Sequence, residues 1–258
     1  MGSFGIGSAY GSFGRSARMC FCITNAISMA FLIVIFGYGI HMVVNYGQYS
    51  ELLAPSLYVD VARIMIIVSI IAFLNAIYGY FSIIKEMRCL SYGYCVANLI
   101  IALMLFIGGM MGHVFVYKLY NQIPLNLKML TSLRELYGIG GQEEITYAWD
   151  ELQKNFGCCG VDGQNDWGVW KTSKWYMHYK THTEKPIIPD SCCKLGMLEH
   201  CRGINLTSDH LFTQTCYQPF NDSLGYVTKV AAWLSITSSI LLIFPVIFAI
   251  LYTRLIRK

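Results

Sequence analysis

The chain has 258 residues, of which 55% are hydrophobic and only 13% are charged. An ordinary soluble domain carries about 25% charged residues, so this composition excludes a disordered chain, a coiled coil and most classes of soluble enzyme. The net charge is +4, but the long polar stretch at 118–229 holds 12 acidic and 11 basic residues. That balance leaves no basic face for a nucleic acid.

Four windows of the chain contain no Asp, Glu, Lys or Arg. They are Met19–Ser50, Ile64–Ile84, Cys89–Tyr117 and Val230–Thr253. Each window reaches the length of about 20 residues that crosses a bilayer as a helix. We therefore predict transmembrane helices at 19–44, 61–84, 94–117 and 227–253.

The basic residues of the short segments set the predicted orientation. Arg15 and Arg18 precede the first span, Lys85 and Arg88 separate the second from the third, and the connection at 45–60 has no Lys or Arg. By the positive-inside rule, the tails 1–18 and 254–258 and the loop 85–93 are cytoplasmic. The small loop 45–60 and the large loop 118–226 are then extracellular.

Small residues within the spans predict close helix packing. Span one offers Ala26, Ala30 and Gly37, span two offers Ser69, Ala72, Ala76 and Gly79, and span three offers Gly108 and Gly112. This pattern favours a left-handed bundle. A small channel or transporter is the competing class, but the spans contain few polar groups beyond Asn25, Asn75 and Asn98, which is a poor lining for conduction.

Two helices are predicted in the large loop. Leu119, Ile123, Leu127, Leu130 and Tyr137 approximate one apolar stripe, which Pro124 interrupts. Ile145, Trp149, Leu152 and Phe156 recur at helical spacing before Gly157.

Six of the ten cysteines fall in the large loop: Cys158, Cys159, Cys192, Cys193, Cys201 and Cys216. An even number in an oxidising compartment predicts three disulfides, and a zinc site is the less favoured alternative. Fifteen pairings are possible, and excluding bonds between sequence neighbours leaves ten. The predicted fold class is therefore an all-α integral membrane protein, a four-helix bundle with a mainly helical, disulfide-stapled large extracellular loop.

The predicted modification sites also divide between the large loop and the cytoplasmic side. The sequons at Asn205 and Asn221 lie in the large loop and predict N-glycosylation, with Asn205 favoured because Asn221 is close to the fourth span. The remaining cysteines lie near the predicted cytoplasmic helix ends, where S-palmitoylation is expected and a small apolar side chain is the alternative. They are Cys20, Cys22, Cys89 and Cys95.

The motifs of the large loop resemble those of the tetraspanin family in its six-cysteine form. The matching residues are Cys158-Cys159-Gly160, Asp166-Trp167, Pro189-Asp190-Ser191-Cys192-Cys193, Cys201 and Cys216. The four spans and the short and long loops fit the family over the whole chain. The resemblance implies the pairs Cys158–Cys216, Cys159–Cys192 and Cys193–Cys201, with no metal site.

The resemblance also implies a non-enzymatic membrane organiser without catalytic residues. Such proteins bind integrins, immunoglobulin-superfamily receptors, membrane proteases or other tetraspanins laterally and gather them into microdomains. A junction protein of the claudin type is disfavoured because its first outer loop would be the large one. The implied location is the plasma membrane, with an endosomal pool open.

Aromatic residues on a displayed loop are typical interaction anchors, so Trp170, Trp175 and Tyr176 are the candidate partner contacts. No cofactor is expected. Membrane lipid surrounds the spans, but a polar cholesterol pocket is disfavoured because Leu105 and Pro245 stand where many tetraspanins carry an acidic residue or glutamine.

Overall fold

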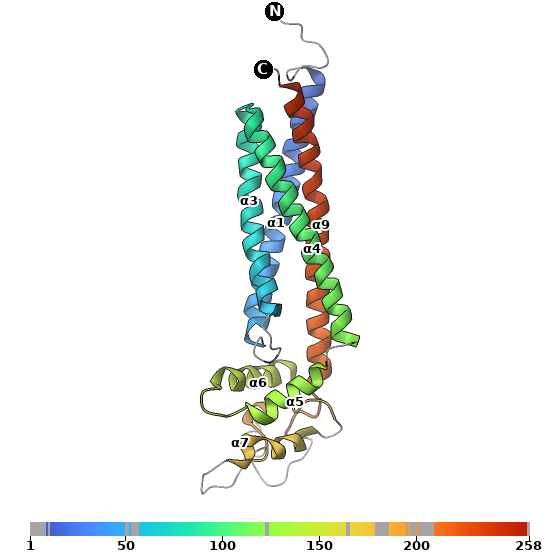
Figure 1. Cartoon of the computed structure of the whole chain (residues 1–258). Coiled ribbons are helices and arrows are strands. Elements are labelled where there is room, and N and C mark those ends of the chain that lie inside the picture. Colours follow the sequence, from blue (N-terminus) through green and yellow to red (C-terminus); the bar gives the residue numbers. More distant parts are fainter. Residues whose placement is uncertain are drawn as a thin grey trace, which may run out of the picture. The chain divides into compact units, whose positions relative to one another are not determined.

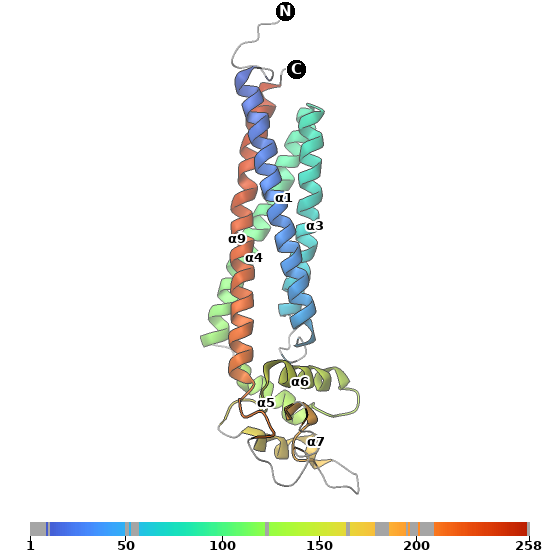
Figure 2. The same cartoon turned by 180° about the vertical axis from the view of Figure 1, so that it is seen from behind.

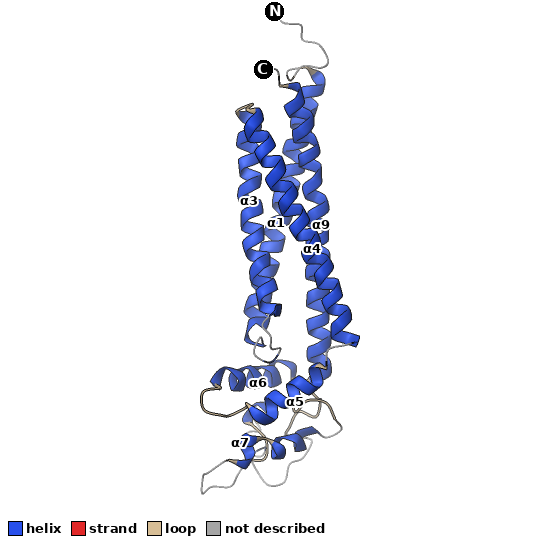
Figure 3. Cartoon of the chain, in the orientation of Figure 1, coloured by secondary structure: helices blue, strands red, loops and turns tan. Residues whose placement is uncertain are grey.

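The computed structural model describes residues 9, 11–49, 52, 57–121, 124–163, 166–178, 186–194, 196, 201 and 209–256. Within these residues the regular elements are helices, and the chain forms no strand (Figure 3). The chain divides into two compact units. The span unit comprises Met1–His41, Val61–Val116 and Thr228–Lys258, and the loop unit comprises Met42–Asp60 and Tyr117–Val227.

Four long helices build the span unit and lie side by side (Figures 1 and 2). They are α1 (Ser12–Tyr46), α3 (Leu57–Ile84), α4 (Arg88–Asn121) and α9 (Tyr217–Leu255). Each contains a window that is long and apolar enough to cross a membrane. The predicted all-α fold class with four transmembrane helices is thereby confirmed, whereas the bounds of the spans stay predictions.

The buried positions of these helices repeat with alternating steps of three and four residues. From Phe21 onward in α1 they are Phe21, Asn25, Ser28, Leu32, Ile35, Gly39 and Met42. In α3 they are Ala62, Met65, Ser69, Ala72, Ala76, Gly79 and Ile83, and the one further buried residue described there is Ser82. Because the mean step is 3.5 residues, these positions form one stripe along each helix, which we call its seam. The seam stays in contact with the neighbouring helices when the helices wind around one another with a left-handed twist. The predicted seam of α3 is correct.

The predicted packing residues of α1 are wrong, and those of α4 are correct only in part. Ala26, Ala30 and Gly37 are exposed on α1, because the residues that follow the seven-residue repeat lie on another face. On α4, a Cβ at Gly108 would meet nothing within 4 Å. A Cβ at Gly109 would lie 2.9 Å from the Ala232 carbonyl oxygen of α9, and one at Gly112 would lie 2.9 Å from the Ala232 Cβ. The close approach of α4 to α9 therefore depends on Gly109 and on the predicted Gly112.

Two buried asparagines each connect three helices. Asn25 of α1 donates to the Ala76 carbonyl of α3 at 3.0 Å and accepts from the Tyr94 hydroxyl of α4 at 3.1 Å. Asn98 of α4 donates to the Leu242 carbonyl of α9 at 2.8 Å and accepts from Asn75 of α3 at 3.3 Å. The amides that could have lined a pore instead hold the helices together.

Pro245 lies inside α9 and has no N–H to donate to the carbonyl four residues earlier, which is that of Leu241. In a bilayer, a carbonyl freed by proline must find another donor within the protein. The Ser28 hydroxyl of α1 lies 3.3 Å from this carbonyl and 3.0 Å from the Thr24 carbonyl of its own helix. Its one hydrogen is therefore shared between the two carbonyls, and Ser28 satisfies the Leu241 carbonyl only in part.

Replacing Asn98 by Leu should destabilise the bundle by about 1 to 2 kcal/mol, because two interhelical hydrogen bonds are lost while the volume is nearly kept. Asn75→Leu removes only one of these bonds and should cost about half as much. Unfolding of the full chain in mixed micelles with rising dodecyl sulfate measures both. Equal unfolding midpoints for wild type and Asn98→Leu would contradict this role.

The loop unit contains short helices. They are η1 (Gly47–Tyr49), α5 (Leu125–Glu135), α6 (Glu143–Phe156), η2 (Asp166–Thr172), α7 (Lys174–Met177) and η3 (Asp190–Cys192). Helix α6 has acidic residues in its first turn and ends at Gly157, whose positive φ of 58° suits glycine. Of its predicted stripe, Ile145, Trp149 and Leu152 are buried and Phe156 is half-buried.

The predicted apolar stripe around α5 is correct only in part: Leu119 and Tyr137 are buried and Leu130 is half-buried, while Ile123 lies outside the described residues. Pro124 precedes the helix and separates it from α4, so α5 does not continue the helical phase of α4. Leu125, Met129 and Leu133 are buried, whereas Leu127 is 58% exposed. An apolar side chain is thus left on the surface of the loop unit.

Candidate functional site

Three disulfides crosslink the loop unit: Cys158–Cys216, Cys159–Cys192 and Cys193–Cys201. These are the pairs that the family resemblance implies. The sequence separations are 58, 33 and 8 residues, so the two adjacent cysteines after α6 connect to two distant segments. All six cysteines are buried, and the bonds form the centre of the unit.

Backbone hydrogen bonds reinforce this centre. The Cys159 N–H donates to the Gln214 carbonyl at 2.8 Å, and the Phe212 N–H donates to the Cys192 carbonyl at 2.9 Å. Gly160 has a φ of 79°, a conformation that side chains disfavour, where the chain turns away from the disulfides. This backbone conformation explains why a glycine stands third in the Cys158-Cys159-Gly160 motif.

A polar cluster ties the Pro189-Asp190-Ser191-Cys192 segment to α6. The Ser191 hydroxyl lies 2.7 Å from Asp150 Oδ1 and 2.6 Å from Gln153 Oε1, and the Tyr137 hydroxyl donates to Asp150 Oδ1 at 2.8 Å. One hydroxyl hydrogen cannot serve two acceptors, and Gln153 Nε2 is buried without a hydrogen-bond partner in the part of the chain that the structure describes. Turning the Gln153 amide so that Nε2 donates to Ser191, which donates to Asp150, removes both conflicts.

Tyr137 should make the loop unit sensitive to alkaline pH. Burial and the Asp150 carboxylate hold the pKa of Tyr137 far above its usual value. Its contribution to stability is therefore complete below pH about 10, where the tyrosine of the unfolded chain is also protonated, and is lost as the pH rises further. Tyr137→Phe should lose about 1 kcal/mol at neutral pH and show a weaker loss of stability above pH 10. Denaturation followed by tryptophan fluorescence at pH 8, 10 and 11 measures both, and an identical pH dependence in the variant would contradict it.

Trp170 was a candidate partner contact, and the structure corrects this. Trp170 is fully buried, and its ring centroid lies 4.8 Å from that of Tyr137, 5.9 Å from Trp175 and 6.4 Å from Trp149, all at edge-to-face angles. Such a cluster is the core of a small domain. The side chain of Trp170 has no surface with which to meet a partner.

Trp175 and Tyr176 lie on α7 and are partly exposed. The Ser173 hydroxyl caps this short helix by accepting from the Tyr176 N–H at 3.2 Å, and Lys174 pairs with Glu135 of α5. Met177 follows and is 59% exposed. We call Trp175, Tyr176 and Met177 the α7 patch. Met177 was not among the predicted contacts, because these were limited to aromatic residues.

The proposed glycosylation sites differ in what the structure describes. Asn205 lies outside the described residues. Asn221 lies in the first turns of α9 with only 3% of its surface exposed, and its Oδ1 is buried without a hydrogen-bond partner among the described residues. A glycan on so buried an amide has no room, so the structure speaks against the predicted modification of Asn221.

The four free cysteines also differ in access. Cys89 is exposed, and Cys20 and Cys22 are half-buried. Cys95 is buried in an apolar cluster with Phe21 and Tyr94. This burial does not fit the predicted acylation of Cys95 and supports the alternative of a small apolar side chain.

Among the described residues, no group of three or more His, Cys, Asp or Glu side chains is arranged to hold a metal ion. The profile of the tetraspanin family matches residues 17–255, from the first long helix to the end of the fourth. The chain belongs to the tetraspanin family. Membership supports a general role in organising membrane proteins, through interactions with other membrane proteins and other tetraspanins. Members of this family are generally non-enzymatic scaffolds.

The chain is also similar in sequence to individual tetraspanins. Tetraspanin-15 of Caenorhabditis elegans is 46% identical over 261 residues and is covered completely, as is this chain. CD151 antigen of Rattus norvegicus is 31% identical over 171 residues, which are 64% of this chain and 65% of that protein. Tetraspanin-11 of Rattus norvegicus is 32% identical over 157 residues, or 60% and 59% of the two chains.

Proposed function

We propose that this tetraspanin binds partner membrane proteins laterally through its large loop and assembles them into microdomains that serve adhesion, trafficking or signalling. The partners would be integrins, immunoglobulin-superfamily receptors, membrane proteases or other tetraspanins. The observation that carries the proposal is the α7 patch, a partly exposed apolar group on a disulfide-linked unit.

The disulfides and the buried tryptophan core hold the unit in one shape before a partner arrives. A binding surface that is ordered in advance loses less conformational entropy on association than a flexible one. Aromatic and methionine side chains are enriched in protein interfaces. The α7 patch combines both properties.

Crosslinking of the full chain in intact cells, followed by mass spectrometry, tests the proposal. The double variant Trp175→Ala/Tyr176→Ala should lower the yield of crosslinked membrane partners severalfold. Tyr147→Ala is the matched control, because Tyr147 is an exposed aromatic residue on α6, away from the patch. Unchanged partner yields in the double variant, with its three disulfides intact by peptide mapping, would refute a role for the patch.

The proposed location is the plasma membrane, with both tails cytoplasmic and the large loop outside. The basic residues beside the spans support this orientation. Palmitoylation is proposed for Cys89, which is exposed, and for Cys20 and Cys22, which are partly buried. Acyl exchange on single cysteine variants tests each site, and labelling of Cys95 would contradict the assignment.

Glycosylation at Asn205 alone is the corresponding prediction for the outer side. Asn205→Gln should lower the apparent mass by one glycan, whereas Asn221→Gln should leave it unchanged because Asn221 is buried. Electrophoresis with and without glycosidase treatment reads out both variants. A shift for Asn221→Gln would show that this residue is accessible during synthesis.

A further inference from the structure

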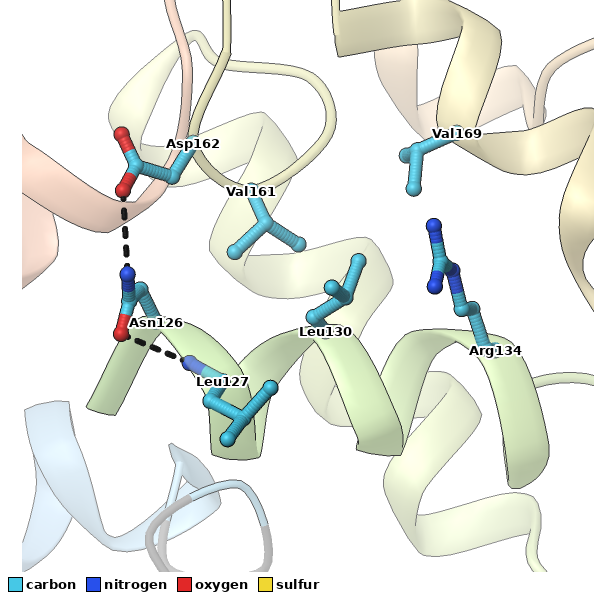
Figure 4. A pocket seen from close by; sticks show the side chains of 7 residues that line it. All are labelled: Asn126, Leu127, Leu130, Arg134, Val161, Asp162 and Val169. Carbon is cyan, nitrogen blue, oxygen red and sulfur yellow. Dashed lines mark hydrogen bonds between the residues drawn. The ribbon is translucent and has the colours of Figure 1, made fainter. Parts of the chain in front are cut away.

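A pocket of about 260 Å³ lies between α5 and the segment that follows the adjacent cysteines. Its lining residues are Asn126, Leu127, Leu130 and Arg134 of α5 with Val161, Asp162 and Val169 (Figure 4). Small-molecule sites usually hold about 300 to 1,000 Å³. This pocket is therefore of a size that suits one or two inserted side chains.

The two ends of the pocket carry opposite charges. Figure 4 shows Arg134 reaching toward Val169 at one end and Asp162 beside Asn126 at the other. Asn126 Nδ2 donates to Asp162 Oδ2 at 3.2 Å, and Asn126 Oδ1 accepts from the Leu127 N–H at 2.8 Å. The acidic end is thus held by hydrogen bonds within the protein.

At the basic end, one guanidinium atom has no such partner among the described residues. Arg134 Nε is buried and makes no hydrogen bond with the part of the chain that the structure describes. A buried donor without an acceptor is costly, and a guanidinium matches a carboxylate with two parallel hydrogen bonds. The positive charge at this end of the pocket therefore favours an occupant that brings a carboxylate.

The middle of the pocket is apolar. Val161 and Val169 are buried, Leu130 is half-buried, and Leu127 is exposed beside them. An occupant that satisfies the whole pocket thus combines an apolar side chain with a carboxylate a short distance away. A simple anion would leave the apolar surface uncovered.

We propose that this pocket binds a segment of a partner's ectodomain in which an Asp or Glu stands next to a large apolar residue. The carboxylate pairs with Arg134, and the apolar side chain packs on Leu130, Val161 and Val169. This inference rests on the proposed lateral binding of membrane partners and adds a second contact to the α7 patch.

Selection of short random peptides on the oxidised full chain in lipid nanodiscs tests the pocket. Peptides retained by the wild type should carry Asp or Glu beside Leu, Ile, Val or Phe. They should bind Arg134→Gln about tenfold more weakly, as expected for loss of a charged hydrogen-bonded pair. Lys128→Gln is the matched control, because it removes one positive charge from an exposed position of α5 outside the pocket lining and should leave binding unchanged.

A second measurement needs no variant of the protein. Replacing Asp or Glu in a selected peptide by its amide should weaken binding to the wild type by the same factor. Selected peptides without an acid, no enrichment at all, or equal binding to Arg134→Gln would overturn the proposal. Dimerisation of the full chain that Arg134→Gln abolishes would also overturn it, because the occupant would be a second copy.

The two proposals fail separately. If peptide binding depends on Arg134 but partner crosslinks are unchanged by substitutions in the α7 patch, the proposed role of the patch is refuted and that of the pocket stands. Partner crosslinks that depend on the patch but not on Arg134 would do the reverse.

Discussion

Replacing both Cys158 and Cys216 by Ala should raise the unfolded fraction of the loop unit about 300-fold. In the chain-entropy model, a bond that spans 58 residues stabilises the folded state by about 4 kcal/mol. The Cys159–Cys192 bond already shortens the loop that this bond closes, so we expect about 3.5 kcal/mol. The loss is large against the total stability of a small domain.

The rate of proteolysis of the full chain measures this loss, because cleavage follows the population of open states. Cys193→Ala/Cys201→Ala is the control, since its bond spans only 8 residues and should contribute about 2.5 kcal/mol. The first variant should therefore be cleaved faster than the second. The opposite order would show that loop length does not govern the stability of this unit.

Trp170→Ala should destabilise the loop unit by about 3 to 5 kcal/mol, the range for removing a fully buried large aromatic side chain. The cavity would open between Tyr137, Trp149 and Trp175, which all contact the indole ring. We expect the variant to be retained inside the cell and to lose partner crosslinks only as a consequence of unfolding.

Trp175→Ala separates folding from binding. Its indole is partly exposed, so the loss of stability should be smaller, while partner crosslinks should fall as strongly as in the α7 double variant. Denaturation and surface display of both single variants give the comparison. A Trp170→Ala chain that is fully folded and displayed, but lacks partners, would restore Trp170 as a contact.

The hydrophobic pattern predicted the four spans because a charge-free window of sufficient length has no other stable state in a bilayer. Helix α6 was equally predictable, since Ile145, Trp149 and Leu152 recur at the helical period and Gly157 ends the helix. The disulfide pairing could not be derived from spacing, which left ten possibilities, and came from the resemblance to tetraspanins. The hydrophobic pattern is a local property of the sequence, and the disulfide pairing is a property shared with relatives.

Other features depend on how the helices are rotated. Ala26 and Gly108 looked like packing residues because small side chains favour close contact, but both face outward. Leu127 was assigned to the buried stripe because the phase of α5 was extrapolated across Pro124. Composition does not specify the phase of a helix relative to its neighbours, so these assignments failed.

The sequence alone determined that this protein is a four-span membrane protein with a crosslinked loop, because hydropathy, charge and cysteine positions act over short distances. Only the tertiary structure decided which aromatic residues are core and which are surface. Trp170 and Trp175 are five positions apart and chemically identical, yet Tyr137, Trp149 and Trp175 enclose the first and leave part of the second open. Burial is a property of the neighbours that folding brings together, and those neighbours come from distant parts of the chain.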